Sequence, residues 1–315
     1  MVWKGFSRHA IGTSHKDQDM PCQDYGDYCI LGDLIIGAVA DGAGSAKYSD
    51  VGAKLAVKTT LKYLKYGIIE SPRSRECDHE KFDFILSDQK TNKLLKLTIL
   101  PPEFVLKLFK KTMTKTTAGL RKEKAIELFV NTVKEVNIAL KNEANNNGYL
   151  INDLACTLLV FVATPHWIAA MQIGDGFIVV CPQDSEDDSD YKIIFKPDKG
   201  EFVNETTFVT STNALDEMQV EVLEGTQEFI CASTDGLEKV AIRTNNWLPF
   251  PPFFKPLKEY MYETPNPKAE HKYLDEFLNS DQLNARTNDD KTLLLCLYQS
   301  KDQVQHTDLQ SLKQE

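Results

Sequence analysis

Short apolar runs rich in β-branched residues recur along the chain, and they predict β-strands. They lie at residues 28–31, 34–40, 155–163, 167–173, 177–181, 191–195, 228–232 and 292–298. Most of these runs alternate poorly between apolar and polar positions. A strand with one solvated face would alternate, so we expect both faces of the sheets to be covered.

Two longer segments carry helical periodicity. Residues 50–66 place Ala53, Val57, Leu61 and Leu64 on one stripe, and the pattern ends at Gly67. Residues 125–145 repeat apolar side chains at steps of three and four, before an Asn-Asn-Asn-Gly stop that ends at Gly148. The strands occur in runs around the helices instead of alternating with them, which favours an α+β fold with antiparallel sheets faced by helices.

The domain organisation follows from where the periodic segments are interrupted. A chain of 315 residues could hold one domain or two. We predict one domain over residues 1–298, with insertions at about 68–124 and 241–270. The second insertion holds a stretch rich in proline and phenylalanine at 247–256, which suits either simple packing or a substrate-side surface. Residues 299–315 are polar and are predicted to form a flexible tail.

Composition narrows the possible partners. The chain has 36 Lys and Arg against 46 Asp and Glu, a net charge of −10, so nucleic acid and membrane surfaces are poor partners. No apolar run is long enough to span a membrane, and the first residues do not resemble an export signal. Seven cysteines without a C-x-x-C pair suit free thiols, so we expect a cytoplasmic protein. We also expect it to be a monomer.

The informative chemistry is aspartate at the ends of apolar strands. Asp41, Asp175 and Asp235 each follow such a strand and precede a glycine, and Asp289 stands just before the last strand. Carboxylates gathered at one edge would repel each other unless cations kept them ionised. Oxygen ligands without a His or Cys cluster favour Mg²⁺ or Mn²⁺, and the carbonyl of Gly42 could add a further ligand.

An alternative explains each Asp-Gly pair separately. Asp-Gly is a common two-residue hairpin turn, so each pair taken alone is more often a turn than a metal ligand. The pair Asp175-Gly176 is the weakest candidate, because it joins two predicted strands as a hairpin would.

The order of the motifs resembles the protein phosphatase 2C family, in particular its bacterial branch. The motifs are Ser14-His15, Cys22-Gln23-Asp24, Ala40-Asp41-Gly42-Ala43-Gly44-Ser45, Ala155-Cys156-Thr157, Ile173-Gly174-Asp175-Gly176, Ser233-Thr234-Asp235-Gly236-Leu237 and Asn288-Asp289-Asp290-Lys291-Thr292. Residues 201–208 also resemble an Asn-Glu-Thr segment of that branch. Each motif alone is weakly specific, but together they occur in the family's order across residues 14–298.

The resemblance implies a four-layer α-β-β-α sandwich and a phosphatase that depends on two Mg²⁺ or Mn²⁺ ions. Asp41 would contact both ions. Asp24 and Gly42 would serve one ion, and Asp235 and Asp289 the other. Asp175 matches a residue associated with a weaker, third ion.

Four positions depart from the family's pattern. Asp19 stands where relatives have a phosphate-binding arginine, and Gln23 stands where many have glutamate. Ala43 replaces a histidine proposed as a general acid in eukaryotic members, and Lys239 replaces an aspartate that helps the third ion.

Three residues could take over the role of the missing arginine, namely Lys16, Arg8 and His15. His15 could also act as a general acid, but a lone histidine beside a turn more often makes a local hydrogen bond.

Two functions from different classes therefore stand. The first is an enzyme that hydrolyses phosphoserine or phosphothreonine on proteins, in bacterial signalling opposite a Ser/Thr kinase. Its protein substrate would be that kinase or one of the kinase's targets. The second is a catalytically weak binding module that recognises a kinase or a phosphoprotein. The departures motivate the second function, whereas the intact set of aspartates favours the first.

Overall fold

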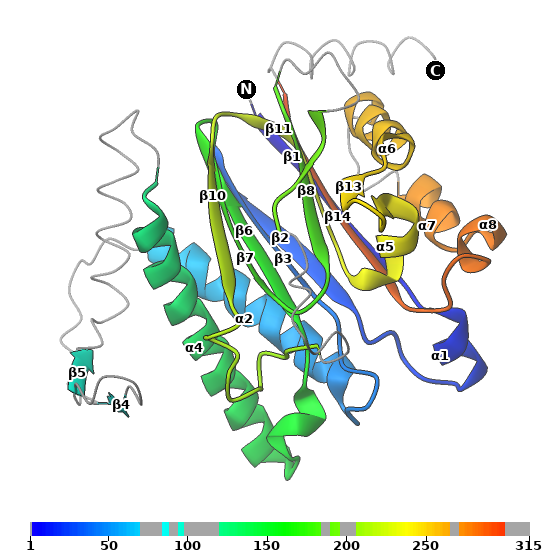
Figure 1. The fold of residues 1–315 in the computed structure, drawn as a ribbon. Helices are drawn as coiled ribbons and strands as arrows, with labels where there is room; N and C mark the ends of the chain where they lie inside the picture. Colours follow the sequence, from blue (N-terminus) through cyan, green and yellow to red (C-terminus); the bar gives the residue numbers. More distant parts are fainter. Residues whose placement is uncertain are drawn as a thin grey trace.

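Two five-stranded antiparallel sheets lie face to face at the centre of the molecule (Figure 1). The computed structural model describes residues 2–69, 84–87, 94–97, 120–183, 190–195, 206–264 and 271–299. The first sheet has the order β1 (Val2–Ala10), β14 (Lys291–Gln299), β11 (Gln227–Ser233), β8 (Phe177–Pro182) and β9 (Lys192–Ile193). The second has the order β10 (Gln219–Glu224), β7 (Trp167–Ile173), β6 (Leu158–Ala163), β3 (Leu34–Ala40) and β2 (Tyr25–Leu31).

Helices cover the outer face of each sheet. Against the second sheet lie α2 (Ser49–Ile69) and α4 (Lys122–Asn147), and on the other side of the sandwich lie α5 (Glu238–Ala241), α6 (Pro251–Glu263), α7 (Lys272–Leu278) and α8 (Asp281–Asn284) (Figure 1). The remaining described elements are α1 (Thr13–Asp17), the 3-10 turns η1 (Ile151–Leu154) and η3 (Asp235–Leu237), and the hairpins β4 (Phe84–Ser87) with β5 (Leu94–Leu97) and β12 (Ile242–Arg243) with β13 (Leu248–Pro249). The predicted four-layer α+β sandwich is therefore confirmed.

Strand β3 shows why the apolar runs alternate poorly. Ile35 and Val39 pack between the two sheets, whereas Ile36 and Ala38 pack under the helices on the other face. Both faces of the strand exclude water, so no polar position is needed along it. The helix layer thus explains the continuous apolar run in the sequence.

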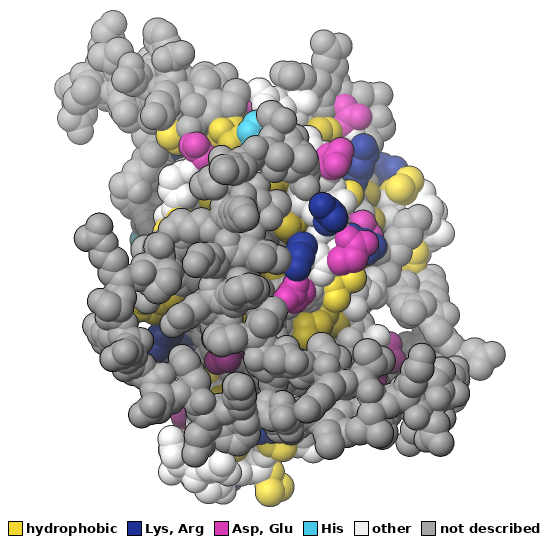
Figure 2. Space-filling model, turned by 90° about the vertical axis from the view of Figure 1, so that its left-hand side faces the viewer, with side chains coloured by type: hydrophobic (Ala, Val, Ile, Leu, Met, Phe, Trp, Pro, Cys, Tyr) yellow, Lys and Arg dark blue, Asp and Glu magenta, His cyan; other side chains and the backbone are white. Residues whose placement is uncertain are grey.

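Charged side chains of both signs occupy the described surface shared by α4 and β10. Lys122 of α4 reaches Glu221 of β10 with 2.8 Å between Nζ and Oε2, and Lys124 pairs with Glu127 in the same helix. Figure 2 shows described Lys and Arg side chains lying beside described Asp and Glu on the face it presents. None of the described helices is long and apolar enough to cross a membrane.

The sheet topology corrects the expectation for one turn. Asp175-Gly176 was expected to be the weakest candidate because it could close a hairpin between its flanking strands. Strand β7 instead pairs with β6 and β10, and β8 pairs with β11 and β9. The turn therefore carries the chain from one sheet to the other, and Gly174 takes a positive φ of 107° there.

The predicted insertions and tail are only partly visible. Most of residues 68–124 and the tail from residue 300 onward lie outside the described residues, as do residues 201–205 of the Asn-Glu-Thr segment. The single-domain boundary stays a prediction. Residues 251–263 in the second insertion form helix α6, which buries Phe254, Leu257 and Met261 against the first sheet.

Candidate metal centre

Three carboxylates from both sheets meet at one end of the sandwich. Asp41 follows β3, Asp175 lies in the turn between the sheets, and Asp235 follows β11. One carboxylate oxygen from each lies within 4.8 Å of the other two, which is close enough to hold a common metal ion. The structure thus brings together three of the sequence-predicted residues that are more than 190 positions apart at their extremes.

Backbone hydrogen bonds fix the turn that carries Asp41. The N–H of Asp41 donates to Oγ1 of Thr157 at 2.9 Å, and the N–H of Thr157 donates back to the Asp41 carbonyl at 2.8 Å. The N–H of Gly42 donates to the Gln23 carbonyl at 3.1 Å. Two other motifs therefore hold the Asp41-Gly42 turn in place.

Asp24 is buried directly beside Asp41. It is only 4% exposed, and its carboxyl group lies close enough to that of Asp41 for each to shift the pKa of the other. Oδ2 of Asp24 accepts a hydrogen bond from Oγ1 of Thr234 at 2.7 Å. Its Oδ1 is also buried, and no described residue donates to it in the hydrogen-bond geometry of the structure. A bound cation would satisfy that oxygen.

Asp235 and Asp289 approach each other because a glycine lies between their loops. A Cβ added to Gly236 would lie 1.8 Å from the carbonyl oxygen of Asp290, so only glycine allows this contact. Asp289 is exposed, and its charge acts on both Asp235 and Asp41. Asp289 therefore borders the group of three without belonging to it.

Asp290 organises the site in a way that sequence reasoning missed. Its carboxylate is 3% exposed and accepts the N–H groups of Gly12 and Gln23, each at 2.6 Å. The ring nitrogen Nδ1 of His15 lies 3.0 Å from its Oδ2. Asp290 thus ties two N-terminal loops to the last strand. The consecutive acids Asp289-Asp290 were the only sequence signal, and they could not distinguish ligand from support.

Burial and mutual repulsion raise the pKa of the central carboxyl groups. Burial is the larger cause for Asp24, Asp41 and Asp235. The nearby charges of Asp24 and Asp235 raise the pKa of Asp41 further. Burial, together with the charges of Asp175 and Asp289, raises the pKa of Asp235 to about 7. Without a counter-charge, part of this group holds protons near neutral pH.

The donor set suits a hard divalent cation. All the converging side chains are carboxylates, and Asp41 lies within 4.8 Å of both Asp175 and Asp235. The hydroxyl of Thr206 donates a hydrogen bond to Oδ2 of Asp175 at 2.7 Å, and this bond orients the Asp175 carboxylate. Carboxylate oxygens are the ligands that Mg²⁺ and Mn²⁺ prefer, so the residues present fit such ions.

The three candidates for the missing arginine all have other partners. Nε of Arg8 lies 3.1 Å from Oδ1 of Asp275, and Nζ of Lys16 donates to Oδ1 of Asn279 at 3.2 Å. His15 faces Asp290, which supports a local hydrogen-bonding role over that of a general acid. In this structure none of the three points into the carboxylate group.

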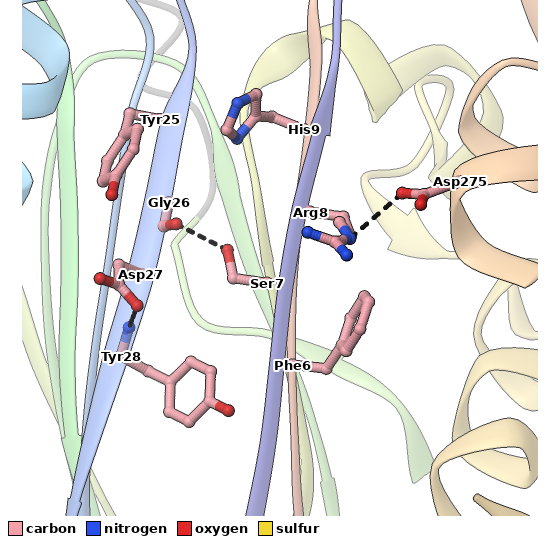
Figure 3. A pocket seen from close by; sticks show the side chains of 9 residues that line it. All are labelled: Phe6, Ser7, Arg8, His9, Tyr25, Gly26, Asp27, Tyr28 and Asp275. Carbon is pink, nitrogen blue, oxygen red and sulfur yellow. Dashed lines mark hydrogen bonds and ion pairs between the residues drawn. The ribbon is translucent and has the colours of Figure 1, made fainter. Parts of the chain in front are cut away.

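A cavity of about 540 Å³ beside Arg8 opens between the edge strands β1 and β2. Figure 3 shows Arg8 turned toward Asp275, while Tyr25 and His9 face the opening from opposite strands. Oγ of Ser7 donates to the Gly26 carbonyl at 2.7 Å and joins the two strands. Of the charged groups that line this cavity, Arg8 is thus paired with Asp275, and Asp27 accepts the N–H of the neighbouring Tyr28.

Comparison with known proteins agrees with the fold and identifies the family. The family model "Protein phosphatase 2C" matches residues 11–279. The chain belongs to the protein phosphatase 2C family, and the expectation of a phosphatase of this class is confirmed.

The relatives match the chain over nearly its full length. Serine/threonine-protein phosphatase 3 of Escherichia coli strain K12 is 28% identical over 305 residues, covering 95% of this chain and 99% of that protein. The crystal structure of a bacterial serine phosphatase has a TM-score of 0.54 at 12% identity and covers 95% of this chain and 98% of its own. A serine/threonine phosphatase from Staphylococcus aureus has a TM-score of 0.52 at 11% identity, with coverages of 95% and 96%. At such identities these structures support the fold alone.

The stability of the metal-free protein should fall as pH rises. The raised pKa values of Asp24, Asp41 and Asp235 mean that the folded state binds protons more tightly than the unfolded chain. That stabilisation is complete below the ordinary aspartate pKa and is lost as pH rises through the raised values. Calorimetry in EDTA should therefore show a lower Tm at about pH 8 than at about pH 5. Added Mg²⁺ should raise Tm more at the higher pH, and an equal rise at both would contradict this account.

Gly236→Ala should weaken both folding and metal binding. The new methyl group cannot fit beside the Asp290 carbonyl, so the Asp235 loop must move. We expect urea denaturation to show a loss of about 1–3 kcal/mol, which is typical of overpacking. Titration calorimetry should show weaker Mn²⁺ binding than in the wild type.

Gly44→Ala is the matched control, because a Cβ there meets no atom within 4 Å. Its unfolding free energy should stay within about 0.5 kcal/mol of the wild-type value. Equal behaviour of the two variants would refute the tight contact at Gly236.

Proposed function

We propose that this protein hydrolyses phosphoserine and phosphothreonine in proteins, with two Mg²⁺ or Mn²⁺ ions held at the carboxylate group. Asp41, Asp235 and Asp289 are the proposed ligands on which catalysis depends. Asp24 and the Gly42 carbonyl support one ion, and Asp175 is available to a weaker, third ion. When bound, such ions lower the pKa of a water molecule and neutralise charge on the phosphoryl group.

The observation that carries this proposal is the convergence of Asp41, Asp175 and Asp235 within 4.8 Å of one another. Asp41 also interacts with both Asp24 and Asp235 strongly enough to shift their pKa values, which supports a role for its carboxylate toward two ions. Thr157 holds the Asp41 backbone and Thr234 holds Asp24, which keeps both carboxylates oriented. Preorganised ligands of this kind reduce the cost of assembling the site.

The source of the proton for the leaving group differs from that proposed for eukaryotic relatives. Ala43 has no proton to give, and His15 faces Asp290 instead of the carboxylate group. We therefore propose that the proton comes from solvent. His15 is then a positioning residue that acts through Asp290.

The cellular role is a further part of the proposal. A Ser/Thr kinase, or a target of that kinase, is the proposed phosphoprotein partner in bacterial signalling, and the proposed state is a cytoplasmic monomer. The cysteines within the described residues are all free, which suits a reducing compartment. The carboxylate group gives more support to an enzyme than to a catalytically weak binding module, since binding alone would not require mutually repelling charges.

Asp41→Asn should abolish Mn²⁺-dependent release of phosphate from a phosphothreonine peptide. The change removes the carboxylate that contacts both Asp24 and Asp235, so we expect a loss of at least about 100-fold in kcat/KM. EDTA should inactivate the wild type, and added Mn²⁺ should restore it. Circular dichroism checks that the variant is folded.

Asp33→Asn serves as the control, because Asp33 is exposed at the opposite end of β3 from Asp41. It should retain wild-type activity. If folded Asp41→Asn also kept its activity, or if EDTA had no effect, the proposed function would be wrong.

A further inference from the structure

A groove of about 730 Å³ lies on the outer face of the first sheet, and residues a few positions from Asp235 and Asp289 in the sequence line part of it. It is bounded by α5 and the β12–β13 hairpin on one side and by α6, α7 and α8 on the other (Figure 1). None of the residues that line this groove is a proposed metal ligand. The groove includes the Pro- and Phe-rich stretch 247–256 that the sequence singled out.

The charged side chains that line the groove are all cations. They are Lys239, Arg243 and Arg286, and no aspartate or glutamate belongs to the lining. All three are exposed, and none forms an ion pair with a described residue. The guanidinium of Arg243 lies over the Phe250 ring at 5.3 Å. In a chain with net charge −10, this group of cations is a local site for negative charge.

Apolar side chains form the floor between these cations. Phe253 packs against Phe277 with 5.9 Å between ring centroids, and Leu257 is buried beneath them. Phe250 and Tyr273 at the rim remain 38% and 48% exposed. Exposed aromatic side chains beside arginine are typical of peptide-binding surfaces.

The chain connects the groove directly to the proposed metal ligands. Lys239 comes four residues after Asp235, and Arg286 comes three residues before Asp289. Three residues of extended chain span about 10 Å. A substrate segment that leaves the carboxylate group along this face would therefore reach the cations within about two to five residues of its phosphorylated side chain.

We propose that this groove binds an acidic segment of the phosphoprotein substrate that flanks the phosphorylated residue. The proposal rests on the proposed function, since the groove matters only if a phosphorylated side chain occupies the neighbouring site. Acidic side chains would pair with Lys239, Arg243 and Arg286, and the aromatic floor would cover the peptide between them. A nucleic acid fits less well, because the negative charge of the rest of the chain repels a long polyanion.

Steady-state kinetics with matched phosphothreonine peptides tests this proposal. One peptide carries Glu at positions two to five on both sides of phosphothreonine, and the other carries Gln there. The wild type should have a lower KM for the Glu peptide, and salt should reduce the difference. Because an exposed ion pair contributes about two- to five-fold, Arg243→Gln should raise that KM by this factor. The triple variant with Lys239→Gln and Arg286→Gln should raise it about ten-fold or more.

The controls separate recognition from catalysis. The kcat for both peptides and the hydrolysis of p-nitrophenyl phosphate should not change in Arg243→Gln. Arg243→Lys should keep most of the preference for Glu. Lys62→Gln, at an exposed lysine of α2 on the opposite side of the sandwich, should have no effect.

Different results would refute the proposed groove and the proposed phosphatase function. Equal KM values for the Glu and Gln peptides, or tighter competition by an oligonucleotide than by the Glu peptide, would refute the acidic-segment groove. Absence of Mn²⁺-dependent hydrolysis of p-nitrophenyl phosphate would instead refute the proposed function. In that case fluorescence anisotropy of the labelled peptides still measures binding, and equal affinity for Glu and Gln peptides would reject the groove as well.

Discussion

The cost of removing several neighbouring carboxylates from water is the constraint on which this structure depends. Asp24 is buried, Asp41 and Asp235 are half-buried, and the three come from distant parts of the chain. Their raised pKa values show that the protein alone does not compensate this charge. Bound cations would offset the free-energy cost of holding these carboxylates together. Cations also provide the charge stabilisation that phosphoryl transfer requires.

In this fold some residues are placed to bind the ions, and other residues hold those ligands in position. Asp41 and Asp235 end strands of different sheets, so the rigid sandwich sets their separation. Asp290, which is not one of the three converging carboxylates, accepts the N–H groups of Gly12 and Gln23 and connects the first loops to the last strand. Strand β1 pairs with β14 along its whole length, from Val2 opposite Gln299 to Ala10 opposite Lys291, so the first and last strands of the fold lie side by side. Ligand placement therefore depends on contacts between the two termini of the fold.

The sequence predicted the covered strands and the two long helices well. Runs such as 34–40 and 167–173 are apolar on both faces, and the strands observed there have the same bounds. The edge strands β1 and β10 were missed, because they mix polar side chains with apolar ones. Helix α6 was not predicted, because its segment was interpreted only as part of an insertion rich in proline and phenylalanine. Its first two prolines in fact occupy the first turn, where proline is tolerated, and Phe254, Leu257 and Met261 keep helical spacing.

The site was predictable in its residue types but not in its arrangement. Asp-Gly pairs at strand ends could be turns or ligands, and only strand pairing showed that Asp175 lies between the sheets and not in a hairpin. The residues that hold the ligands in place depend on contacts between positions far apart in sequence, such as Thr234 with Asp24 and Asp290 with Gly12, which a single sequence does not reveal.

The most direct measurement of the proposed metal centre is anomalous diffraction from crystals grown with Mn²⁺. Our account predicts two manganese peaks that share Asp41 as a ligand, whereas crystals with manganese bound elsewhere and none at Asp41 would contradict it.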